Sequence, residues 1–163
     1  MENVKEKLSI MEDSDRFKDW RKKNPDSYLT HAFCMHDGTS IDEWQFGYYN
    51  KSRDKIATFV LDDDVSLMPE SDVLKKDDLL NKLDIENVKV DVTKALEISK
   101  KCQEEKYKGQ IPLKTIILLQ HLNEGLVWNI TYLTVAFKTL NIKVSAIDGK
   151  IADSSLKSLI SQA

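Results

Sequence analysis

Two stretches of the chain alternate apolar and polar side chains at the same spacing. In EWQFGYYN, residues 43–50, bulky apolar side chains recur at every second position from Trp44, and in VWNITYLT, residues 127–134, they do so from Trp128. Successive side chains of a strand point to opposite faces of a sheet, so each stretch predicts a strand with one buried face. The two matching stretches lie 84 residues apart, which indicates that the chain contains one structural unit twice.

The segments on either side of these strands repeat as well. Residues 29–36 align with 114–121 at an offset of 85, and residues 55–62 align with 141–148 at an offset of 86. Each of these segments carries alternating or continuous apolar positions, which predicts a strand. Each half of the chain is therefore predicted to hold three antiparallel strands.

A helix is predicted ahead of the strands in each half. In the second half, Asp91 or Thr93 can cap a helix with a 3.6-residue apolar stripe at Val92, Ala95, Leu96, Ser99 and Cys102. In the first half, EDSD at residues 12–15 is expected to divide the helix in two, and Pro25 closes it. A short helix is expected after each third strand, at residues 71–75 and 154–158.

These elements predict an α+β fold of two pseudo-repeated units, residues 1–84 and 85–163. Each unit has a helix, a three-stranded antiparallel sheet and a short closing helix, and the two units are expected to form one compact body. Joining edge to edge and packing face to face both remain open. The residues expected in the core are Phe33 or Cys34, Trp44, Phe46, Ile56, Val60, Leu96, Cys102, Ile117, Leu119, Trp128, Ile130, Val144 and Ala146.

Three segments of the second half carry a family resemblance: DVTKALEISKK (91–101), VWNITYL (127–133) and IKVSAIDGKI (142–151). In these segments the chain resembles the PepSY and PepSY-like domains, and more loosely the cystatin-type folds; the first half is similar only through the internal repeat. The resemblance implies a helix-plus-three-strand module. PepSY modules occur in propeptides that inhibit their own peptidases and in cell-envelope proteins, and they share no catalytic residues.

Composition narrows the classes of function. The 163 residues include 24 basic and 27 acidic side chains, well mixed along the chain, for a net charge of −3. No basic face is evident, so nucleic acid is not expected as a partner. No segment approaches the about 20 apolar residues of a membrane span, so we expect no membrane partner and a cytoplasmic location, with removal of a signal peptide as the alternative. The two cysteines, Cys34 and Cys102, are expected to be buried and reduced, with a disulfide between them as the alternative.

The polar site suggested by the repeat is a pair of histidines. His36 and His121 end equivalent strands, so a two-fold relation between the halves could bring their imidazoles together. A metal would need a further ligand from Cys34, Asp37 or Glu124, and no metal-binding spacing is present, so we expect no metal or cofactor. The competing interpretation is that both histidines cap strands at a solvated rim.

The remaining candidate is the sheet face opposite the helices. The side chains expected on it are Tyr49, Gln45, Glu43, Leu133 and Asn129. An open face of this kind suits an unknown partner protein or self-association, as in a homodimer. The sequence therefore favours a non-enzymatic binding or protein-interaction module. The alternative is a small ligand-binding protein or enzyme with a cystatin-like cavity that uses His36 and His121.

Overall fold

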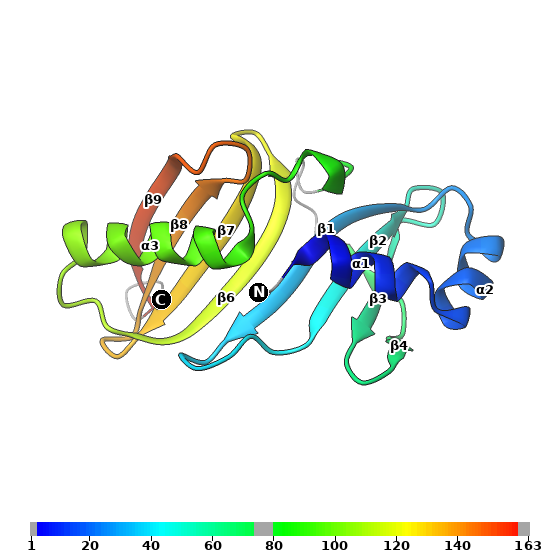
Figure 1. Ribbon diagram of the computed structural model, residues 1–163, viewed down its shortest axis with the longest axis horizontal. Helices are drawn as coiled ribbons and strands as arrows, with labels where there is room; N and C mark the ends of the chain where they lie inside the picture. The colour runs from blue at the N-terminus through cyan, green and yellow to red at the C-terminus, as the bar shows by residue number, and fades with distance from the viewer. Residues whose placement is uncertain (1–2, 74–79, 160–163) are drawn as a thin grey trace.

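A single antiparallel sheet organises the chain. The computed structural model describes residues 3–73 and 80–159, and within them nine strands pair in the order β4-β3-β2-β1-β6-β7-β8-β9, with β5 also beside β3 (Figure 1). The first half contributes α1 (Val4–Glu12), α2 (Asp15–Lys23), β1 (Tyr28–His36), β2 (Trp44–Asn50), β3 (Lys55–Leu61), β4 (Val65–Leu67) and β5 (Ser71–Asp72). The second half contributes η1 (Ile85–Asn87), α3 (Val92–Lys106), β6 (Pro112–Leu122), β7 (Gly125–Thr134), β8 (Lys138–Ser145) and β9 (Ile151–Ser158).

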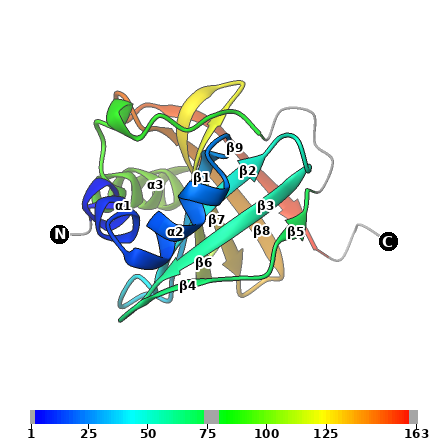
Figure 2. The same cartoon turned by 90° about the vertical axis from the view of Figure 1, so that its right-hand side faces the viewer.

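The three α-helices of the described residues cover the same face of the sheet. Figure 1 shows α3 over β7 and β8, α1 and α2 over the strands of the first half, and β6 crossing between them. In the perpendicular view of Figure 2 the helices lie together on one side. The predicted break in the first helix is confirmed: Ser14 caps α2, and its Oγ accepts a hydrogen bond from the Phe17 N–H at 3.2 Å.

The two halves join edge to edge through their first strands. β1 and β6 pair antiparallel from His31 opposite Gln120 to His36 opposite Thr115, with Phe33 opposite Leu118 near the middle. This pairing satisfies the backbone groups of an edge that each half would otherwise expose. The predicted α+β class with an antiparallel sheet is confirmed, and the question of edge or face packing is answered.

The predicted short helices after the third strands are wrong where the structure describes them. Residues 154–158 belong to β9, where Leu156 pairs with Leu140 of β8. Ser71 and Asp72 form β5, while residues 74–79 lie outside the described residues. A helix of about five residues gains few hydrogen bonds for the entropy it loses, whereas pairing along β8 satisfies a whole row of backbone groups.

The core lies between the helices and the covered sheet face. Trp44, Phe46, Trp128 and Ile130 are buried as predicted. The prediction fails on β3: Ala57 and Phe59 are buried, whereas Ile56 and Val60 are half-buried on the opposite face. The register explains this, because Phe59 pairs with the buried Phe46 and paired residues share a face. Phe33 is likewise half-buried, with Cys34 in the core.

Candidate functional site

A groove of about 680 Å³ lies between α3 and the central strands, on the helix-covered side of the sheet. We call it the α3 groove. Its lining comes from α3, from the beginning of β6, from β7 and from the loop between β1 and β2. The residues are His36, Gly38, Thr39, Ser40, Ile41, Thr93, Leu96, Glu97, Lys100, Gln103, Pro112, Thr115 and Tyr132. The volume falls within the range of about 300–1,000 Å³ typical of ligand pockets.

One face of α3 forms a wall of this groove. Asp91 caps the helix, and its Oδ1 accepts a hydrogen bond from the Lys94 N–H at 2.9 Å. The buried stripe of the helix follows the prediction except at Leu96, which is half-buried and faces the groove. Leu96 is therefore an apolar side chain that packs against the core on one side and remains partly uncovered at a concave surface.

The floor of the groove is formed by buried side chains of β6 and β7. Tyr132 is 5% exposed, and its hydroxyl forms a short hydrogen bond with Ser99 Oγ of α3. Burial raises the pKa of Tyr132, so this phenol stays neutral. Thr115 is also buried and lies beside Tyr132 in the register of β6 with β7. The floor is thus rigid and largely uncharged.

The rim opposite α3 is the turn that follows β1. Asp37 Oδ1 accepts hydrogen bonds from the Thr39 N–H at 2.9 Å and the Ser40 N–H at 3.1 Å, and also from the Thr39 hydroxyl. These bonds hold the pKa of Asp37 at about 2. The Gly38 N–H donates to His36 Nδ1 at 3.0 Å, and Gly38 has a φ of +101°, which favours glycine. The neutral His36 ring therefore carries its proton on Nε2.

The titratable side chains of the groove do not form an acid–base unit. His36 Nδ1 is occupied by Gly38, and Glu97 forms an ion pair with Lys94 at 3.6 Å. No hydrogen bond or ion pair joins His36, Glu97 and Lys100 to one another in the described part of the chain.

The two histidines singled out in the sequence lie apart. His36 pairs with Thr115, whereas His121 lies six residues farther along β6, a separation of about 20 Å at roughly 3.3 Å per residue. The expectation that the imidazoles converge is therefore wrong, because antiparallel pairing of β1 with β6 sends equivalent strand ends in opposite directions. Across residues 3–73 and 80–159, no three His, Cys, Asp or Glu side chains are grouped so that they could hold a metal ion.

The sheet face opposite the helices holds the predicted surface residues, with one exception. Gln45 and Asn129 are half-buried and lie in one cross-strand row through the Phe33–Leu118 pair. Glu43 is exposed just before β2, and Leu133 is half-buried in another row. The predicted exposure of Tyr49 is wrong, because this side chain is buried and only 8% exposed.

Local contacts explain the burial of Tyr49. Its ring packs edge-on against Tyr28, and its hydroxyl donates to Asp54 Oδ1 at 2.6 Å, which raises its pKa to about 12. Asn129 is similarly engaged, since its amide donates to Gln120 Oε1 and its Oδ1 accepts from Asn141. The side-chain amides of Gln120, Asn129 and Asn141 are thus hydrogen-bonded to one another.

His31 lies on this open face directly over Gly47. A Cβ on residue 47 would lie 2.1 Å from Cε1 of the His31 ring, so glycine is required by the close approach. Burial lowers the pKa of His31 to about 4. The imidazole contacts Thr30 Oγ1 through Nδ1 at 3.1 Å and is a packed, neutral side chain.

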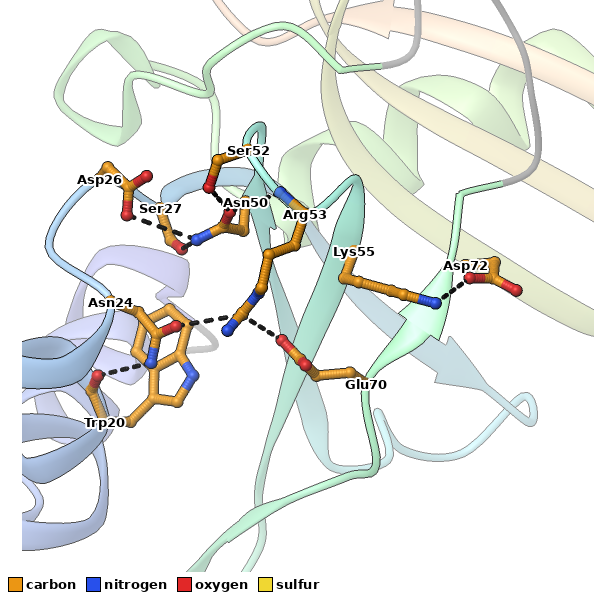
Figure 3. A network of polar contacts seen from close by, with 10 residues as sticks. All are labelled: Trp20, Asn24, Asp26, Ser27, Asn50, Ser52, Arg53, Lys55, Glu70 and Asp72. Carbon is orange, nitrogen blue, oxygen red and sulfur yellow. Dashed lines mark hydrogen bonds and ion pairs between the residues drawn. The ribbon is translucent and has the colours of Figure 1, made fainter.

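A polar network fastens the outer part of the first half. Arg53 of the β2–β3 turn donates to Asn24 Oδ1 at 3.0 Å and contacts Glu70 (Figure 3). In the same view Lys55 of β3 pairs with Asp72 of β5. The network thus links the β3–β5 edge to the end of α2 through exposed pairs, which contribute little to stability individually.

The α3 residues that line the groove were not predicted as a site from the sequence. Thr93, Leu96, Glu97, Lys100 and Gln103 recur at three- to four-residue spacing, which places them on one face beside the buried stripe. Their mixed polarity resembles any solvated helix face. The sequence feature that could have indicated the groove is Leu96, an apolar residue at the border of this helix face.

Comparisons with known proteins identify a shared fold. No family model matches the sequence, and a comparison with curated proteins finds no match. Among solved structures, the chain is similar to a crystal structure of a "putative lipoprotein" from Clostridium difficile 630, with 16% identity and a TM-score of 0.56. The similarity covers 88% of this chain and 91% of that chain, and at this identity it concerns the fold alone. No helix in residues 3–73 and 80–159 has the length and apolarity to cross a membrane.

Proposed function

We propose that this protein is a non-catalytic binding module that receives a segment of a partner protein in the α3 groove. The observation that carries this proposal is the groove itself, a concave surface with a partly uncovered apolar side chain at Leu96 and a rigid floor at Tyr132. Apolar contacts at Leu96 and Ile41 would supply affinity, and the polar groups around them would fix the position of the bound segment.

The shape of the groove favours a polypeptide over an enclosed small molecule. Its rim residues Thr39, Ser40, Glu97 and Lys100 are exposed, so a bound group stays partly in contact with solvent. Pockets for small molecules instead bury about 70–90% of the ligand surface. A segment that places one apolar side chain on Leu96 while its backbone runs along the rim matches this geometry.

The arrangement of the polar groups in the α3 groove supports the proposal of binding without turnover. The Tyr132 phenol is neutral and engaged with Ser99, and His36 has one ring nitrogen occupied by a backbone N–H. The alternative of an enzyme or ligand-binding protein uses His36 or His121 in a cavity; His36 lines the α3 groove, and the register of β1 with β6 keeps His121 at the other end of the strand pair. The geometry therefore favours recognition.

We also propose that the two halves are copies of one PepSY-like unit. The support comes from the joint: Phe33 and Leu118 lie 85 residues apart, the offset at which residues 29–36 align with 114–121, and they pair directly. Two identical units joined by a two-fold axis would place equivalent residues opposite each other at that axis. Gln45 and Asn129, separated by 84 residues, then occupy corresponding places in the same row.

A peptide-display selection on the folded full chain tests the binding proposal. Selected peptides should bind the wild type in calorimetry and lose at least roughly tenfold in affinity with Leu96→Arg, which places a charge on the apolar wall. Ser40→Trp, which fills the groove from the exposed rim, should weaken the same peptides. Glu104→Arg is the matched control, because Glu104 is an exposed position of α3 outside the groove.

The opposite pattern would overturn the proposal. If selected peptides bind Leu96→Arg and Ser40→Trp as tightly as the wild type, the groove is not the recognition site. Thermal unfolding of each variant separates lost binding from lost folding, and Ser40→Trp covers the case in which Leu96→Arg fails to fold.

A further inference from the structure

Five large apolar side chains gather at one end of the second half. We call Ile111, Leu113, Val135, Phe137 and Leu159 the apolar tip, and their exposed fractions run from 45% to 64%. Backbone hydrogen bonds hold the three contributing segments together: the Val135 N–H donates to Ile111 O and the Leu159 N–H donates to Phe137 O, each at 3.0 Å. The five exposed apolar side chains therefore stand on adjoining backbone at one end of the sheet.

Phe137 makes the patch unusual. Its φ is +57°, in the left-handed region that Gly or Asn normally occupies in a turn. The residue is 64% exposed, so most of its surface makes no contact that could offset this conformation. A phenylalanine that is both in an unfavourable backbone conformation and in water indicates a contact outside the fold.

The charged side chains in the three stretches that carry the tip are all basic. Residues 107–115, 132–141 and 154–159, which form the tip and its surroundings, contain Lys108, Lys114, Lys138 and Lys157 and no Asp or Glu. The register places Lys114 opposite Leu133, Leu133 opposite Thr139, and Thr139 opposite Lys157. Two lysines therefore lie at either side of the tip in one cross-strand row, and Lys138, the first residue of β8, follows Phe137 directly.

We propose that the apolar tip docks on an anionic lipid surface. The exposed aromatic and aliphatic side chains would enter the headgroup region, while the lysine side chains extend to the lipid phosphates. An apolar centre with lysines on its own strands is the composition that such a surface selects, and a protein partner would need matching acidic side chains around an apolar pocket. This contact is peripheral and concerns a different surface from the α3 groove.

The position of the tip gives the docking an orientation. The tip begins at Ile111, and the next residue, Pro112, lines the α3 groove. A chain docked through the tip would therefore hold the groove near the lipid surface, where its bound segment would also lie.

Vesicle sedimentation with the full chain tests this proposal. The probes are phosphatidylcholine vesicles and vesicles in which roughly one quarter of the lipid is phosphatidylglycerol. The wild type should bind the anionic vesicles, and added salt should weaken the binding. Phe137→Ser with Leu113→Ser should reduce the partition coefficient at least roughly tenfold, and Lys114→Gln with Lys157→Gln should reduce it about fivefold per lysine.

The control is Ile10→Ser, which removes an equally exposed apolar side chain, 56% exposed, from α1. It should bind vesicles as the wild type does. Failure of the wild type to bind anionic vesicles, or equal binding by the tip variants, would overturn the proposal. So would a dimer or a protein complex that is lost in Phe137→Ser while vesicle binding is absent, since the tip would then be a protein interface.

Discussion

Trp44 and Trp128 meet edge to face, with ring centroids 6.3 Å apart and planes inclined by 61°. They belong to β2 and β7, on either side of the β1–β6 joint, and each is at most 2% exposed. The Trp128 indole N–H also donates to Val90 O at 2.8 Å, which anchors the segment that leads into α3. The hydrophobic cores of the two halves are therefore continuous across the joint.

Truncation of Trp128 should be strongly destabilising. Trp128→Ala removes a fully buried ring, its contact with Trp44 and its hydrogen bond to Val90, so we expect a loss of about 3–5 kcal/mol in the free energy of unfolding. Urea denaturation followed by circular dichroism measures it. Trp20→Ala, at a half-buried position, is the control and should cost less. A loss below about 1 kcal/mol for Trp128→Ala would contradict the burial.

The neutral packing of His31 should make stability depend on pH. Its folded pKa of about 4 lies below the ordinary 6.5, so between these values the unfolded chain binds more protons than the folded chain. Stability should therefore fall as the pH decreases from about 6.5 towards 4, by at most about 1.4 kcal/mol per pH unit from this group. The difference between the wild type and His31→Gln over this range measures the effect.

His121→Gln is the matched control, because His121 is exposed. It should follow the pH dependence of the wild type. Parallel curves for the wild type and His31→Gln would mean that His31 remains solvated when it is protonated.

The close approach of His31 to Gly47 can be tested by a double-mutant cycle. Gly47→Ala introduces a methyl group into the volume of the imidazole and should cost roughly 1–3 kcal/mol. In a His31→Ala background the same change should cost at most about 0.5 kcal/mol, because the ring is gone. Equal costs in both backgrounds, measured by chemical denaturation, would show that the ring avoids the methyl group by rotation.

The left-handed backbone at Phe137 predicts a gain in stability. Phe137→Gly removes the steric cost of this conformation and loses little packing, so unfolding should become harder by roughly 0.5–1 kcal/mol. Phe137→Ala keeps the unfavourable conformation and should bring no such gain. Calorimetric unfolding of both variants checks this, and equal stabilities would indicate a turn that relaxes without strain.

Much of the element order was predictable because the sequence carries local signals. The EDSD break, the Asp91 cap and the alternation around Trp44 and Trp128 each reflect rules that act over a few residues. The alternating apolar positions in both halves indicated which segments lie in the sheet. The α3 stripe was predictable for the same reason, apart from Leu96.

The predictions that failed concern features set by contacts between segments that are distant in sequence. Both faces of β3 carry apolar residues, so only its register with Phe46 decides that Phe59 is inside. Residues 154–158 are strand because β8 offers an edge, and their own sequence favours neither element strongly. The separation of His36 from His121 follows from antiparallel pairing at the joint, which no local pattern specifies.

The joint between β1 and β6 has a consequence for the kinetics of folding. Its paired residues are 79–89 positions apart in the chain, whereas β1 to β3 and β6 to β8 are successive hairpins. Closing the long loop costs chain entropy before the contacts between β1 and β6 form. We therefore expect pairing of β1 with β6 to limit the folding rate. Leu119→Ala at the joint should then slow folding, whereas Leu156→Ala in the outer β8–β9 hairpin should mainly accelerate unfolding in stopped-flow measurements.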